Sequence, residues 1–126
     1  MLKNFVTSLH KSTKRNYIAR MNDDKINCMI ISIKYDNEYW DGDRRYGYGG
    51  YKYIPGYWKG VAKALIKEYE LSNHSKIIDL GCGKAYLLHE IKQLLPSINI
   101  VGIDISRYAI NNSTKEIKPY LKIFDA

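Results

Sequence analysis

Residues 77–85 read Ile77-Ile78-Asp79-Leu80-Gly81-Cys82-Gly83-Lys84-Ala85. An apolar run leads into a turn that contains two glycines, and a helical pattern of leucines and isoleucines begins directly after it. A buried strand that passes through a glycine turn into a helix is the place where a parallel sheet binds ligands, beyond the carboxyl ends of its strands. Glycine lets the backbone turn tightly and lets a ligand approach it closely.

Strand and helix patterns alternate downstream of this turn. The predicted elements are a strand at 76–80, a helix at 85–95 that stops at Pro96, a strand at 98–103, a helix from Ser106 to about Lys118, and a strand at 120–124. Because nearly continuous apolar strands alternate with helices, we expect an α/β fold, with a parallel sheet and helices on both faces.

A helical extension is predicted before this domain. Residues 22–35 have apolar side chains at helical spacing, which would face the core or the next domain, and Asn22 is placed to cap the helix. A second helix is predicted at 61–70. We therefore divide the chain into an N-terminal helical extension with a loop, residues 1–60, and the first part of an α/β domain, residues 61–126.

Residues 35–60, called here the Tyr/Gly segment, hold seven of the twelve tyrosines, both tryptophans and six of the nine glycines. A long loop with this many aromatic side chains is typical of an ordered, functional loop. We expect either a lid over a bound ligand or a cover for the sheet. Its charged residues would recognise a substrate phosphate or carboxylate, or form a solvated turn; they are Asp41, Asp43, Arg44 and Arg45.

Acids stand at the ends of all three predicted strands: Asp79, Asp104 and Asp125. Asp104 follows the glycines by about 20 residues, the spacing at which a carboxylate accepts hydrogen bonds from ribose hydroxyls. The turn lacks the third glycine of a dinucleotide site, because Tyr86 occupies that position. It also lacks the hydroxyl residue of a nucleoside-triphosphate loop, because Ala85 follows Lys84.

These residues resemble a known family. Residues 79–85 are similar to the first motif of class I S-adenosylmethionine-dependent methyltransferases, Asp-x-Gly-x-Gly-x-Gly, residues 101–106 to its second-strand motif and residues 124–126 to its third. The run from Tyr39 to Tyr51 resembles the N-terminal extension of a bacterial subgroup. The resemblance covers residues 75–126 and implies a Rossmann-like methyltransferase fold that is incomplete, because the chain ends at the third of seven strands.

The resemblance also implies site roles. Asp79 and the amides of the turn residues Gly81, Cys82 and Gly83 would hold the methionine part of the cofactor. Asp104 would bind the ribose hydroxyls, and Ile105 would pack on the adenine. Asp125 would accept from the adenine amino group, with the Ala126 amide near the ring. Ala85 departs from the family pattern, which has a third glycine there.

The expected function is S-adenosylmethionine-dependent methyl transfer to a small-molecule acceptor, and no catalytic residue is identifiable. One alternative is a non-catalytic cofactor-binding or interaction module left by truncation, which would self-associate through an uncovered sheet. A nucleic-acid-binding protein is less favoured, because the net charge of +7 is concentrated in the first 20 residues. The three histidines share no metal-site spacing.

Composition places the chain among small globular domains, with 45% hydrophobic and 26% charged residues. No apolar run is long enough for a membrane-spanning helix, and no signal-peptide pattern follows the first residues. The two cysteines, Cys28 and Cys82, are too few for a disulfide framework. We therefore expect a cytoplasmic protein.

Overall fold

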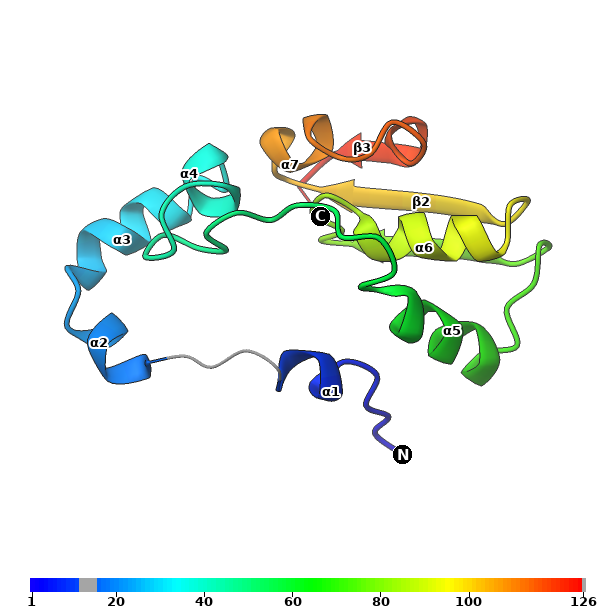
Figure 1. Ribbon diagram of the computed structural model, residues 1–126. Coiled ribbons are helices and arrows are strands. Elements are labelled where there is room, and N and C mark those ends of the chain that lie inside the picture. The colour runs from blue at the N-terminus through cyan, green and yellow to red at the C-terminus, as the bar shows by residue number, and fades with distance from the viewer. Residues whose placement is uncertain (12–15, 126) are drawn as a thin grey trace.

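The computed structural model describes residues 1–11 and 16–125. Three parallel strands form one sheet in the order β1-β2-β3: β1 (Lys76–Leu80), β2 (Asn99–Asp104) and β3 (Leu121–Ile123) (Figure 1). Ile77 lies opposite Ile100, and Asp104 lies opposite Ile123. The predicted open parallel sheet of an incomplete Rossmann-like fold is confirmed.

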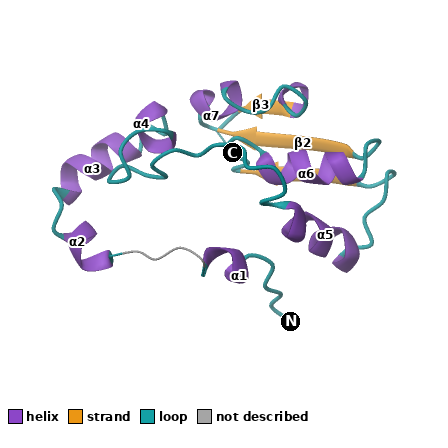
Figure 2. Ribbon diagram, in the orientation of Figure 1, coloured by secondary structure: helices purple, strands orange, loops and turns teal. Residues whose placement is uncertain are grey.

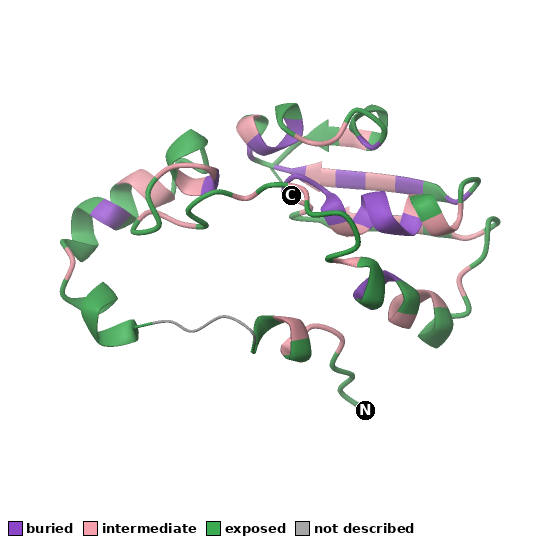
Figure 3. Cartoon of the chain, viewed as in Figure 1, coloured by how far each residue is buried: buried purple, intermediate pink, exposed green. Residues whose placement is uncertain are grey.

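Helices α5 (Lys59–Glu68), α6 (Tyr86–Leu94) and α7 (Arg107–Asn111) accompany the sheet, and a short 3-10 turn, η1 (Lys118–Tyr120), leads into β3 (Figure 2). The buried residues are concentrated in α6 and β2 (Figure 3). The main apolar cluster comprises Ala62, Ala85, Leu88, Ile91, Ile98, Ile100 and Ile117. This core fixes the sheet and therefore the positions of the strand ends.

Helix α7 is shorter than its sequence pattern predicts. Ser106 caps its start as expected, because its Oγ accepts a hydrogen bond from the Ala109 amide at 3.0 Å. The helix ends at Asn111 rather than near Lys118. Two polar side chains compete with helix continuation there: Asn112 donates to the Tyr108 carbonyl and Ser113 donates to the Ile110 carbonyl.

Within residues 1–11 and 16–60, the N-terminal extension forms the short helices α1 (Thr7–His10), α2 (Tyr17–Met21), α3 (Lys25–Ser32) and α4 (Asn37–Trp40) (Figure 1). The helix predicted over 22–35 is present but shorter, as α3, and the prediction that Asn22 caps its start is wrong. Asn22 ends α2, and Asp24 precedes α3 in the left-handed region, with φ 30°. The apolar face of α3 is exposed and so forms no core; its residues are Ile26, Met29, Ile30 and Ile33.

One side of β1 carries no helix. Ile78 and Leu80 alternate with the inward-facing residues of the strand, and their side chains are 68% and 63% exposed. Helix cover on both faces of the sheet, as expected from the sequence, is therefore not present at β1 within the described residues.

The proposed domain boundary at residues 60 and 61 remains a prediction. In the described part of the chain, no helix combines the length and the apolar character that a bilayer crossing requires.

Candidate functional site

The Tyr/Gly segment lies against the carboxyl ends of the strands (Figure 1). Its Trp40 is 6% exposed, and the indole N–H donates to the Ser106 Oγ at 2.9 Å and to the Tyr35 carbonyl at 3.1 Å. The indole ring also covers the glycine turn so closely that a Cβ on Gly83 would lie 2.7 Å from it. The segment is therefore packed onto the predicted site in this structure.

A cavity of about 360 Å³ lies between this segment and the strand ends, and we call it the strand-end cavity. It brings together four of the predicted site residues: Gly81, Asp104, Ile105 and Asp125. The rest of its wall is largely aromatic, with Tyr35, Tyr39, Trp40 and Tyr48 from the Tyr/Gly segment and Phe124 from the end of β3. The sequence indicated the Tyr/Gly segment as a lid or a cover, but it did not indicate which aromatic side chains would line the cavity.

Asp104 is the buried acid of this cavity, with 8% exposure. One carboxylate oxygen accepts the Gly83 amide at 2.7 Å, and the other accepts the Ser106 amide at 2.7 Å. Each carboxylate oxygen has two acceptor sites, so both retain capacity for a further hydrogen bond. Asp104 is thus held rigidly by the backbone and can still accept from a ligand.

The glycine turn departs from the expected donor role. The amides of Gly81 and Cys82 both donate to the Ile103 carbonyl, at 2.8 and 3.1 Å, and the Gly83 amide is committed to Asp104. These three N–H groups are therefore used within the protein rather than presented to a cofactor. Gly81 has φ 78° and open space where a Cβ would stand, so a ligand can approach its backbone.

Asp79 and Cys82 lie beside the strand-end cavity without lining it. Burial, reinforced by the charge of Asp104, raises the pKa of the half-buried Asp79. Burial, together with the charges of Asp79 and Asp104, raises the pKa of Cys82 to about 12. The Cys82 sulfur packs against Gly102: a Cβ built on Gly102 would lie 2.9 Å from it. Cys82 therefore serves as a neutral packing residue.

The remaining sequence-predicted positions are placed as follows. Asp125 is exposed at the rim of the strand-end cavity, and Ala126 lies outside the described residues. Ala85 has φ 58°, in the left-handed region, and is 1% exposed. The family's glycine at this position thus corresponds to a backbone conformation that disfavours a side chain.

A buried ion pair that the sequence did not indicate joins the two parts of the chain. Lys84 is 3% exposed, and its Nζ lies 2.7 and 2.9 Å from the Asp41 carboxylate oxygens and 2.7 Å from the Tyr51 carbonyl. The Tyr108 hydroxyl donates to the same carboxylate at 2.7 Å, and the Tyr86 hydroxyl donates to the Tyr51 carbonyl at 3.1 Å. Asp41 is therefore a structural partner and not a free group for substrate recognition.

The other charged residues near Asp41 in the Tyr/Gly segment also have hydrogen-bond partners. Arg45 makes a two-bond contact with Asp23, at 3.0 and 2.5 Å. Arg44 donates to the Gly47 and Tyr48 carbonyls at 2.6 and 2.9 Å. Asp43 accepts the Arg45 amide, an interaction of an ordered turn. Both arginines line a second cavity that is separate from the strand ends.

Comparison with known proteins bears on the α/β part of the chain. Residues 71–120 match a family model described as a methyltransferase domain. Searches of curated proteins and of solved structures found no match. The matched range contains β1, the glycine turn, α6, β2 and α7. Four of the residues that line the strand-end cavity lie in it: Gly81, Ile103, Asp104 and Ile105. The match and the parallel sheet together support a methyltransferase domain with a Rossmann-like sheet over residues 71–120.

Proposed function

We propose that the strand-end cavity binds S-adenosylmethionine and that the protein takes part in methyl transfer to a small-molecule acceptor. One observation carries the proposal: a rigidly held, buried carboxylate, an exposed apolar side chain and an aromatic wall meet in one cavity. Asp104 provides the first and Ile105 the second. Methyl transfer is the activity of the matched domain, while the cofactor and the acceptor class are our inference.

The lining fits the chemistry of this cofactor. A volume of about 360 Å³ is in the range of small-molecule sites. Asp104 supplies acceptors suited to a pair of ribose hydroxyls. Ile105, 53% exposed, offers an apolar surface for a flat base. A sulfonium cation suits a wall of aromatic rings, since the faces of such rings attract cations.

When bound, S-adenosylmethionine supplies a methyl group on a positively charged sulfur, which an acceptor displaces in line. The chain's own contribution would be to position and to exclude water, because orientation accounts for much of the rate in such transfers. Trp40 and Tyr48, whose rings stack at 5.1 Å between centroids, form part of the cover that would keep water out. No residue is assigned as a base.

Binding of S-adenosylhomocysteine, measured by calorimetry, tests the proposal. Replacing Asp104 is a poor choice of variant, because its carboxylate also satisfies two backbone amides. Ile105→Ala is better, because the side chain is half exposed and faces the cavity. Removing its contact with the base should weaken binding by about 1 kcal/mol, roughly fivefold.

Ile78→Ala is the matched control, because Ile78 is exposed on β1 and lies outside the strand-end cavity. We expect its affinity to equal that of the wild type. Absence of binding to the wild-type protein, or equal weakening by both variants, would contradict the proposed site. Label transfer from methyl-labelled cofactor into an extract of small metabolites then tests the acceptor class. Label found only in RNA or protein would overturn that part of the proposal.

A further inference from the structure

A second and larger cavity, of about 570 Å³, lies between helices α2 and α3 and the turn that contains Arg44 and Arg45. We call it the basic cavity. Its lining includes four basic side chains, from Arg20, Lys25, Arg44 and Arg45, against one acidic side chain, from Asp23. The net charge of the lining is therefore positive, and an anionic ligand would complement it.

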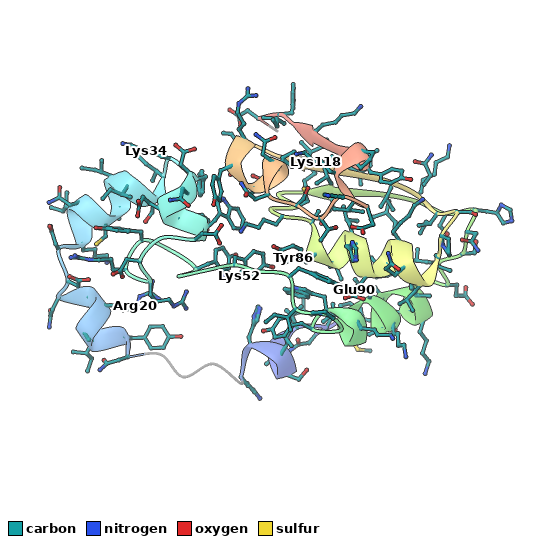
Figure 4. All side chains as sticks on the ribbon, turned by 45° about the horizontal axis from the view of Figure 1, so that its top comes forward. Arg20, Lys34, Lys52, Tyr86, Glu90 and Lys118 are labelled. Atoms are coloured by element: carbon teal, nitrogen blue, oxygen red, sulfur yellow. The ribbon has the colours of Figure 1, made fainter. Side chains whose placement is uncertain are left out.

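The basic groups are of two kinds. Arg44 and Arg45 are held in place, the first by two backbone carbonyls and the second by Asp23. For Arg20 and Lys25, no side-chain hydrogen bond or ion pair is found within residues 1–11 and 16–125. Figure 4 shows Arg20 on α2. Two basic side chains without such partners and two guanidinium groups that are held in place thus line one cavity.

The remainder of the lining strengthens attraction to an anion. Met21, Cys28 and Met29 supply apolar surface, and Cys28 is 8% exposed. A wall of low polarity lowers the local dielectric constant, so an ion pair beside it is stronger than one in bulk water. The arrangement differs in this respect from a set of basic side chains on an open surface.

The basic cavity adjoins the strand-end cavity. Tyr39 and Tyr48 line both, and their rings meet edge to face with 5.5 Å between centroids. A ligand anchored in the basic cavity is therefore separated from the strand-end cavity by these two rings. Tyr48 is 43% exposed, so an acceptor that approaches from solvent can contact the ring that stands between the two cavities.

We propose that the basic cavity binds the phosphate or carboxylate group of the methyl acceptor, with Arg20 and Lys25 as its main charge partners. The inference rests on the proposed function of the strand-end cavity and adds the chemical class of the acceptor. Arginine forms paired hydrogen bonds with the oxygens of either anion, and lysine adds a point charge. The acceptor's anionic group would occupy this cavity while its nucleophilic atom reaches past Tyr48.

Titration of the full chain with inorganic phosphate, followed by nuclear magnetic resonance at constant ionic strength, tests this site. A parallel titration with acetate represents the carboxylate class. We expect saturable shifts at Arg20, Lys25 and their neighbours with one or both anions. The double variant Arg20→Gln/Lys25→Gln should weaken the binding at least fivefold. The control Lys63→Gln/Lys67→Gln removes the same charge from the exposed surface of α5 and should leave it unchanged.

The outcomes separate the two proposals. Saturation by phosphate, by acetate or by both supports an anion site and identifies the anion class. Non-saturable shifts, or equal weakening by the test and control variants, overturn it. S-adenosylhomocysteine affinity should be unchanged in the Arg20→Gln/Lys25→Gln protein, which also shows that this variant is folded. Phosphate binding without any S-adenosylhomocysteine binding would remove the proposed cofactor site and leave the anion site standing.

Discussion

Removing either partner of the Lys84–Asp41 ion pair should have unequal effects on stability. Asp41→Ala leaves the Lys84 ammonium, 3% exposed, without its counter-ion. Loss of one partner of a buried pair typically costs about 3–5 kcal/mol. The Asp41 side chain is 23% exposed, so water can partly take its place beside Lys84 in the variant. We therefore expect a loss of about 3 kcal/mol in the free energy of unfolding, at the lower end of this range. This is a large share of the roughly 5–15 kcal/mol that stabilises a small domain.

Lys84→Met should lower the free energy of unfolding by less, because the carboxylate left behind keeps other hydrogen-bond partners. The Asp41 carboxylate keeps its hydrogen bonds from the Tyr108 hydroxyl and the Tyr51 amide and is partly solvated. The Tyr51 carbonyl keeps the hydrogen bond from Tyr86. We expect a loss of about 1 kcal/mol, the usual net contribution of a hydrogen bond. The double variant should be more stable than Asp41→Ala alone.

Urea unfolding followed by far-ultraviolet circular dichroism measures all four proteins of this cycle, with Lys63→Met as the exposed control. Equal losses for the two single variants, or additivity within about 0.5 kcal/mol, would refute the reasoning. Burial on its own would raise the pKa of Asp41, but the hydrogen bonds from Lys84 and Tyr108 outweigh it and lower the pKa below 3.8. A lowered folded-state pKa adds stability that is present above the unfolded-state pKa and is lost as the pH falls through the folded-state value. The difference between wild type and Asp41→Ala should therefore be constant from neutral pH to about pH 5 and shrink below about pH 4.

Three further predictions concern the site. Gly83→Ala should lower the thermal unfolding midpoint more than Gly81→Ala. Both glycines have positive φ, but a Cβ on Gly83 would lie 2.7 Å from Trp40, whereas a Cβ on Gly81 would meet no atom within 4 Å. Equal midpoints for the two variants would contradict this packing. With a pKa of about 12, the fraction of Cys82 in the thiolate form at pH 8 should be about 10⁻⁴. Cys82 should therefore react with a chromogenic disulfide reagent far more slowly in the folded protein than in the unfolded protein, and the rate of absorbance change measures this. The Tyr51 amide donates to a carboxylate at 2.9 Å, so its hydrogen exchange should be slow even without cofactor; fast exchange that cofactor slows would favour a mobile lid instead of a fixed cover.

The sequence by itself determined the order and type of the α/β elements. The strand predicted at 76–80 coincides with β1, and the boundaries of α6 and β2 differ from prediction by one residue at each end. These elements follow from apolar periodicity and from Pro96, which act over a few residues. The glycine turn was identifiable for the same reason, because its residues are adjacent in the sequence. Asp104 was identifiable because a single helix, α6, sets its distance along the chain from the glycine turn.

Only the tertiary structure decided which polar groups of the site are free. The amides of the glycine turn are used by the Ile103 carbonyl and Asp104, from the neighbouring strand. Asp41 is neutralised by Lys84, which lies 43 residues away in the chain. The aromatic wall of the strand-end cavity likewise comes from residues 35–48, before the domain that it covers. Pairing across such distances depends on how helices and strands pack, and no local pattern of apolar or charged residues encodes it.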